Sequence, residues 1–168
     1  MSAFNHHHGS AGDVSPVEMA TVVSVRQMSI VRPAKCTPRH RLWLSNLDIV
    51  HPKTHLKTIY IYKEADSQHS TSSDFFDAKM MKDALSKALV PFYPMAGRLG
   101  RDNNGRLELD CNGEGVLFQE ADVETTINQL GEFLHKAEDE LTELVPSVGY
   151  SKGISSYPLF LLQVSPLG

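Results

Sequence analysis

Apolar and polar residues alternate at different spacings along the chain, and each spacing predicts a type of element. Residues 21–31 are rich in β-branched side chains and precede a proline, which predicts a strand with a bulge at Gln27. In residues 56–63 isoleucine alternates with tyrosine, which is the strongest strand signal in the first half of the chain. Residues 42–50 are apolar but contain an asparagine and an aspartate, which predicts a turn between packed pieces.

Helical spacing replaces this alternation after Asp77, a residue that can cap the first turn of a helix. Apolar residues at helical spacing within 81–89 predict the helix, and Pro91 and Pro94 end it. Gly97 is expected to supply backbone freedom before a new strand. Because an apolar helix that leads into an aromatic corner is costly to expose, we expect this stretch to pack against a sheet.

The second half of the chain continues the alternation of strands and helices. Its predicted elements are a hairpin of residues 98–101 and 106–111, a strand at 116–121, two short helices within 124–144 and an interior strand at 158–164. This order of elements indicates an α/β or α+β layer, with a mixed β-sheet and flanking helices.

Residues 1–20 differ in composition from the rest of the chain, because they are mostly small and polar and are rich in Gly and Ser. Three consecutive histidines, His6 to His8, favour a tag-like disordered leader and leave a metal-chelating segment as the alternative. The remaining residues 21–168 have the length of one domain with a single core.

Charge and the lengths of apolar runs exclude two classes of partner. The chain has a formal net charge of −4 and no cluster of Lys and Arg, so we do not expect it to have a nucleic-acid-binding surface or a nucleic-acid partner. Its apolar runs are far shorter than the roughly 20 residues of a membrane span. Cys36 and Cys111 show no disulfide or metal spacing, which favours free thiols in a reducing compartment. These features predict a cytoplasmic protein.

The residues by themselves supply no complete catalytic set. His51 and His55 are spaced as on one face of a helix, but Pro52 argues against a helix that presents both to a metal ion. Cys111 ends a predicted hairpin strand and is better explained as a small apolar filler than as a nucleophile. We therefore predict no metal site.

Several stretches, in order along the chain, resemble the plant BAHD acyltransferases and, within them, the hydroxycinnamoyl-CoA transferases. None is a catalytic signature, and the resemblance depends on their order and density after Thr21. The stretches are MSIVRPAKCTP at 28–38, RLWLSNLDIV at 41–50, TIYIYK at 58–63, FFDAKMMKDALSKALVPFYPMAGRL at 75–99, RDNNGRLELDCNGEGVLFQEAD at 101–122 and VPSVGYSKGISSYPLFLLQV at 145–164.

The resemblance implies the N-terminal part, incomplete, of a chloramphenicol-acetyltransferase-like domain. Such enzymes move an acyl group from a coenzyme A thioester to an alcohol or amine, with acyl-CoA as co-substrate and no bound cofactor. The His of their HxxxD motif is the general base. The family pattern places this motif after the strand that ends at Val164, and a DFGWG motif much later. We therefore expect this chain to correspond to roughly the first third of the enzyme, without its catalytic His.

The resemblance also implies three pocket residues, His55, Thr58 and Tyr60, near the tunnel where the acyl group and the acceptor meet. The alternative for Tyr60 is the outer face of a strand, since it alternates with isoleucines. Lys57 departs from a common form of the family, which leaves the identity of the acceptor open.

A second hypothesis is a non-catalytic, truncated product that acts as an interaction module. The apolar strand predicted at 158–164 needs neighbours on both sides, and a bare sheet edge can bind another chain. Its partner would be the missing C-terminal portion of such an enzyme or a second copy of this chain.

Overall fold

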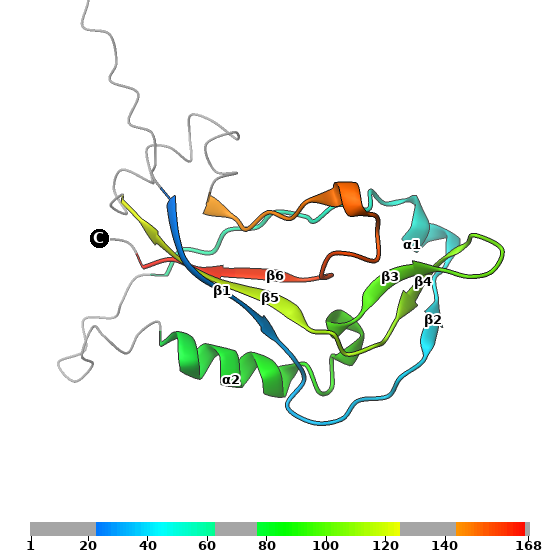
Figure 1. The fold of residues 1–168 in the computed structure, drawn as a ribbon, viewed down its shortest axis with the longest axis horizontal. Helices are drawn as coiled ribbons and strands as arrows, with labels where there is room; N and C mark the ends of the chain where they lie inside the picture. The colour runs from blue at the N-terminus through cyan, green and yellow to red at the C-terminus, as the bar shows by residue number, and fades with distance from the viewer. Residues whose placement is uncertain (1–22, 63–76, 125–143, 167–168) are drawn as a thin grey trace, which may run out of the picture.

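The computed structural model describes residues 23–62, 77–124 and 144–166, and its main sheet has the strand order β1-β5-β6 (Figure 1). Strand β1 (Val23–Val31) pairs antiparallel with β5 (Val116–Val123), which pairs parallel with β6 (Leu161–Val164). The two kinds of pairing confirm the predicted mixed sheet. A register shift between Val25 and Gln27 confirms the predicted bulge.

Strand β6 lies at the edge of this sheet. Among the described residues it pairs with β5 alone, so the prediction of an interior strand is wrong here. The apolar sequence of this strand predicts a neighbouring strand on each side. In the structure one face of β6 packs on the core, where Val164 is buried and Leu162 lies against the cluster, and this burial accounts for its apolar residues.

A second, antiparallel sheet contains β2 (Arg41–Trp43), β4 (Leu107–Asp110) and β3 (Arg98–Arg101), in that order. Strands β3 and β4 are the predicted hairpin. The Asp102 carboxylate accepts hydrogen bonds from the backbone N–H groups of Asn104 and Arg106, at 2.9 and 2.8 Å, and Gly105 has a φ of 81°. Strand β2 was not predicted, because three residues carry too little pattern to be recognised without their partner β4.

Helix α1 (Asn46–Val50) replaces the turn predicted within 42–50. The Ser45 hydroxyl accepts a hydrogen bond from the Asp48 N–H, and the Asp48 carboxylate accepts one from the Ser45 N–H at 2.8 Å. This reciprocal pair is a capping box, so the polar residues start a helix rather than a turn. The hydrogen bond from the Ser45 hydroxyl group and that from its backbone N–H lower the pKa of the Asp48 carboxyl.

Helix α2 (Ala78–Ala88) begins as predicted at Asp77, whose carboxylate accepts a hydrogen bond from the Met80 N–H at 2.8 Å. The helix covers one face of the main sheet (Figure 1). Leu89, Ala96 and Phe118 are buried in one core cluster, which confirms that the helix and the proline corner pack against the sheet. The core continues through Val31, Val116 and Val164, with Met81 and Leu85 of α2 packed against it.

The glycine of the proline corner has a different role from the predicted one. The corner forms a short 3₁₀ helix, η1 (Tyr93–Ala96), and Gly97 follows it with an ordinary φ of −87°. A Cβ on Gly97 would lie 2.3 Å from the carbonyl oxygen of Asp110. Glycine is therefore required at this position by the close approach of β4, not by backbone freedom.

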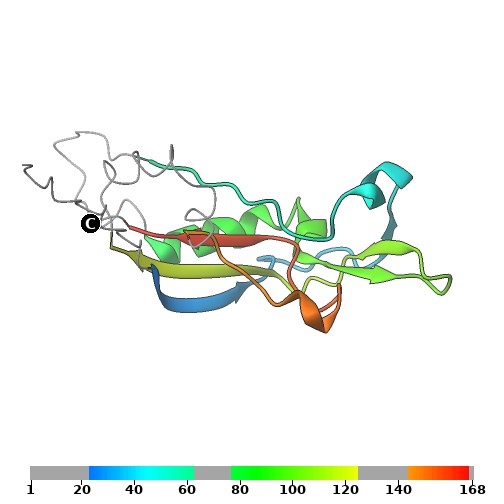
Figure 2. The same ribbon diagram turned by 90° about the horizontal axis from the view of Figure 1, so that it is seen from above.

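Residues 52–62 form an extended segment that follows α1 and crosses one face of the main sheet (Figure 2). The strand predicted for 56–63 is wrong over its described part, since residues 56–62 have no strand assignment. The alternation of Ile and Tyr is present, but no described strand lies beside the segment to form a ladder with it. Lys63, the leader at 1–20 and most of the helices predicted within 124–144 lie outside the described residues.

None of the helices in the described part of the chain is long and apolar enough to cross a bilayer.

Candidate functional site

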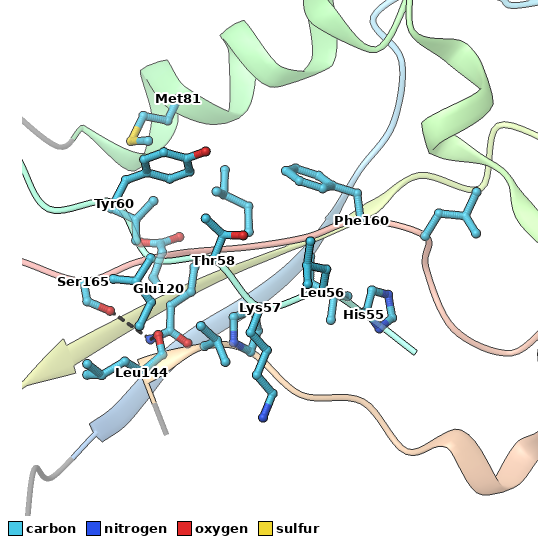
Figure 3. Close-up of a pocket in the computed structure, with 18 of the residues that line it drawn as sticks. His55, Leu56, Lys57, Thr58, Tyr60, Met81, Glu120, Leu144, Phe160 and Ser165 are labelled. Atoms are coloured by element: carbon cyan, nitrogen blue, oxygen red, sulfur yellow. Dashed lines mark hydrogen bonds between the residues drawn. The ribbon is translucent and has the colours of Figure 1, made fainter. Parts of the chain in front are cut away.

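The structure contains a large cavity of about 1320 Å³ between the extended segment and the main sheet (Figure 3). Its lining combines residues 52–62, Ala78 and Met81 of α2, Leu144 to Pro146, Tyr157, Leu159 to Pro166, and Arg26, Leu99, Glu120 and Val123. His55, Thr58 and Tyr60 all line it, so the structure brings the three sequence-predicted residues to one cavity. Its volume exceeds that of typical small-molecule pockets, as expected for an open groove rather than an enclosed site.

His55 lies at one end of the cavity with both of its ring nitrogens engaged (Figure 3). Nε2 is 2.7 Å from the Pro158 carbonyl oxygen, and Nδ1 is 2.8 Å from the Tyr150 hydroxyl oxygen. The ring also packs edge-on against Tyr157, at 5.6 Å between centroids. The imidazole therefore connects two segments of the protein and has no nitrogen free to accept a proton from a substrate.

Thr58 and Tyr60 lie farther along the extended segment. Tyr60 is 75% exposed, and it lies with Met81 at the end of the cavity formed by α2. Because no described strand contains Tyr60, the alternative that it occupies the outer face of a strand is also wrong. An exposed aromatic ring beside a methionine presents an apolar surface with a hydroxyl group at its end.

Two polar residues of the lining, Glu120 on β5 and Gln163 on β6, have partners inside the protein. Gln119 donates a hydrogen bond to the Gln163 side chain at 2.7 Å, and the Gln163 amide donates to the Leu144 carbonyl at 3.0 Å. Glu120 forms an ion pair with Lys82, whose ammonium group lies 5.2 Å from the centre of the Phe118 ring. These contacts occupy the amide of Gln163 and the carboxylate of Glu120, so neither side chain is an unpaired polar group of the lining.

The described lining can therefore contact a ligand, but its imidazole is not free to act as a base. His55 is the one imidazole in the lining, and both its nitrogens have partners. Burial raises the pKa of the Tyr157 hydroxyl, and the neighbouring Tyr150 raises it further. Tyr157 consequently stays protonated and donates a hydrogen bond to the Lys53 carbonyl at 2.7 Å.

The other candidate groups lie elsewhere. Cys36 is exposed and Cys111 is buried, and burial followed by the charge of Asp110 raises the pKa of the Cys111 thiol. Burial fits the predicted role of Cys111 as an apolar filler. Within the described residues, which contain His51 and His55, no group of three or more His, Cys, Asp or Glu side chains could hold a metal ion.

Two short catalytic patterns occur in the sequence that the sequence interpretation missed. Residues 149–153 match GxSxG, but Ser151 lies in the exposed 3₁₀ helix η3 (Tyr150–Lys152) and not on a strand-to-helix elbow. His135 and Asp139 match HxxxD. This match precedes β6, whereas the resemblance implies an HxxxD motif after that strand, and residues 135–139 lie outside the described residues.

Comparison with known proteins places the chain in a family. The family model described as Transferase family matches residues 21–168. The chain is 48% identical over 143 residues to a shikimate O-hydroxycinnamoyltransferase from Nicotiana tabacum, covering 85% of this chain and 31% of that protein. It is 49% identical over 148 residues to a hydroxycinnamoyl-CoA:5-hydroxyanthranilate N-hydroxycinnamoyltransferase from Avena sativa, covering 85% of this chain and 33% of that protein.

A solved structure has the same fold. The crystal structure of vinorine synthase matches with a TM-score of 0.58 and 22% sequence identity, covering 87% of this chain and 35% of that one. The chain thus spans about a third of the length of the curated relatives and of this structure. The family match, the identities to hydroxycinnamoyltransferases and the shared fold lead to one conclusion: the chain belongs to the Transferase family, the plant BAHD acyltransferases.

Proposed function

We propose that this chain is the N-terminal portion of an acyltransferase that moves a hydroxycinnamoyl or related acyl group from coenzyme A to an alcohol or amine. The observation that carries the proposal is the identity of nearly one half to hydroxycinnamoyltransferases over 85% of the chain. The names of these relatives include both an O-acyl and an N-acyl transfer. The group on the acceptor that receives the acyl group is therefore either a hydroxyl or an amino group.

In this proposal the cavity forms one wall of the pocket for the acyl group and the acceptor. Its lining offers an aromatic ring at Tyr60 and apolar surface at Met81 and Phe160, which suit a flat phenylpropenoyl group. The Thr58 hydroxyl supplies one polar contact in the same lining. Acyl-CoA is the co-substrate, and the wall itself needs no bound metal.

The general base would come from polypeptide that the longer relatives contain and this chain does not span. A base is needed because an alcohol attacks a thioester carbonyl only as its proton leaves. We therefore expect the purified chain to release no coenzyme A from p-coumaroyl-CoA above background, with shikimate or 5-hydroxyanthranilate as acceptor. Turnover by the purified chain would contradict the missing-base argument, and a His135→Ala variant would then show whether the HxxxD match at 135–139 supplies the base.

A chimera tests the pocket directly. Residues 23–166 replace the matching third of the tobacco relative, and we expect the chimera to turn over p-coumaroyl-CoA. In that background Tyr60→Ala should lower kcat/KM by about tenfold, which corresponds to one lost aromatic contact. Phe92→Ala is the matched control, because Phe92 is similarly exposed but does not line the cavity. Equal kinetics for the two variants would remove Tyr60 from the pocket.

An interaction module is the second candidate function, and the edge position of β6 favours it. One side of this apolar strand has no partner among the described residues, and such an edge can accept a further strand. The occupant would be the remaining portion of a longer relative. A cooperatively unfolding monomer that does not bind this portion in sedimentation experiments would contradict the module. The cytoplasmic location stays a prediction.

A further inference from the structure

The contacts of His55 define a small cluster, the His55 tether, formed by His55, Tyr150, Tyr157 and the Pro158 carbonyl group. His55 and Tyr150 are 95 residues apart in sequence, so the cluster connects the extended segment to the chain that leads into β6. The three rings are packed together, with centroid distances of 5.6 Å for His55 and Tyr157 and 5.0 Å for Tyr150 and Tyr157.

The hydrogen bonds of the tether fix the tautomer of His55. A carbonyl oxygen can only accept, so the Nε2 atom facing Pro158 must carry a hydrogen. In the neutral ring Nδ1 is then an acceptor, and the Tyr150 hydroxyl donates to it. The lone pairs of the same hydroxyl oxygen accept the His55 backbone N–H, at 3.3 Å. Every donor in the cluster thus meets an acceptor.

The tether determines where the extended segment lies. The Tyr157 hydroxyl donates to the Lys53 carbonyl at 2.7 Å, so Lys53 and His55 are both held while Leu56, 93% exposed, packs against little. The segment has no strand ladder in the described structure. Side-chain hydrogen bonds at one end therefore replace the backbone pairing that normally positions such a segment.

We propose that His55 is a positioning residue, held as the Nε2–H tautomer, which places Thr58 and Tyr60 over the main sheet. It does not bind the acceptor itself, because both of its nitrogens already have protein partners. The role as a pocket-positioning residue rests on the proposed function, whereas the tether itself does not. Its tests therefore use the full chain without acyl-CoA, and their failure is distinct from a failure of the chimera to turn over.

Two measurements test the tether. Long-range ¹H–¹⁵N correlation spectra of the histidine rings should show His55 in the Nε2–H form. In limited proteolysis with trypsin, His55→Ala should accelerate cleavage after Lys57 by about tenfold, since local opening governs cleavage and each lost hydrogen bond shifts it several-fold. Cleavage after the exposed Lys35 serves as the internal reference. His55→Gln retains a donor that can reach the Pro158 carbonyl and should restore part of the protection.

The chain offers a matched control in a second His–Tyr contact. His40 Nε2 lies 3.4 Å from the Tyr93 hydroxyl, with the ring centroids 5.7 Å apart, and neither residue belongs to the extended segment or lines the cavity. His40→Ala should leave the rate after Lys57 unchanged. Tyr150→Phe removes a single hydroxyl group, so it keeps the test decisive if His55→Ala does not fold. An Nδ1–H ring, or equal cleavage rates in the wild type, His55→Ala and Tyr150→Phe, would overturn the proposal.

Discussion

The main core and the extended segment show two different ways of holding chain in place. Around Phe118, strands from both ends of the chain and helix α2 bury apolar side chains, and Ala96, Val116 and Phe118 are completely inaccessible to solvent. The extended segment buries almost nothing and is held at one end by the His55 tether. The first arrangement stabilises the fold, and the second sets the position of one cavity wall.

This difference teaches that stability and site geometry depend on separate residues in this chain. Apolar burial contributes about 25 cal/mol per Å², so the core dominates the free energy of unfolding. A few hydrogen bonds contribute much less, yet they are directional and can fix a wall to within the accuracy that binding requires. Substitutions in the two regions should therefore affect different measurements.

The largest expected effect comes from the core. Phe118→Ala should lower the free energy of unfolding by about 3–5 kcal/mol, because the buried ring leaves a cavity. Tyr60→Ala should change it by less than about 0.5 kcal/mol, since the ring is mostly exposed. Urea denaturation followed by circular dichroism measures both values. Comparable losses for the two variants would contradict the separation of the core from the extended segment.

A smaller loss is expected at Gly115, where β5 begins against β1. Gly115 has a φ of 100°, and a Cβ there would lie 2.5 Å from the Val31 carbonyl oxygen. Gly115→Ala should therefore cost about 3 kcal/mol in the free energy of unfolding, from backbone strain and the clash together. Gly105→Ala is the control: its φ is 81° but the space around it is open, so about 1–2 kcal/mol is expected. Urea denaturation measures both variants, provided that the dependence of the unfolding free energy on urea concentration has the same slope in each. Equal midpoints for Gly115→Ala and Gly105→Ala would show that the contact with Val31 has no effect.

The smallest effect concerns α1, which leads into the extended segment. Hydrogen bonds from Ser45 lower the pKa of the Asp48 carboxyl in the folded state. The contribution of this carboxylate to stability is thus fully present above the unfolded-state pKa of about 3.9 and is lost as the pH falls through the lower folded-state value. In an NMR titration Ser45→Ala should raise the pKa of Asp48 towards its ordinary value, and Ser45→Thr should not. An unchanged pKa in Ser45→Ala would refute the capping box in solution.

Signals that were local in the sequence predicted the fold well. The bulged strand β1, the Asp77 cap of α2 and the hairpin of β3 and β4 each depend on neighbouring residues, and the structure confirms them. The sequence also contains the signal of the α1 capping box, a serine three residues before an aspartate, although the polar residues of 42–50 by themselves predict a turn. A turn is the wrong prediction here because it depends on the polar composition of the stretch and not on the three-residue spacing of Ser45 and Asp48.

Features that depend on distant partners could not be predicted this way. Residues 56–62 have the pattern of a strand, but a strand forms only where another strand can pair with it. Gly97 lies against a carbonyl group on β4, and no residue near it in sequence indicates this contact. The three pocket residues came from the family resemblance, and the tyrosines that hold His55 lie about a hundred residues away with no sequence signal to connect them.

The pairing of β1 with β5 has a consequence for how the protein is made. Ser29 on β1 donates a hydrogen bond to the Phe118 carbonyl, 89 residues farther along the chain. At a synthesis rate of about 5–20 residues per second, β1 leaves the ribosome roughly 5–20 seconds before β5 does. During that time nascent β1 cannot form its backbone hydrogen bonds with β5. We therefore expect the binding of chaperones to the nascent chain to be highest between the emergence of β1 and that of β5.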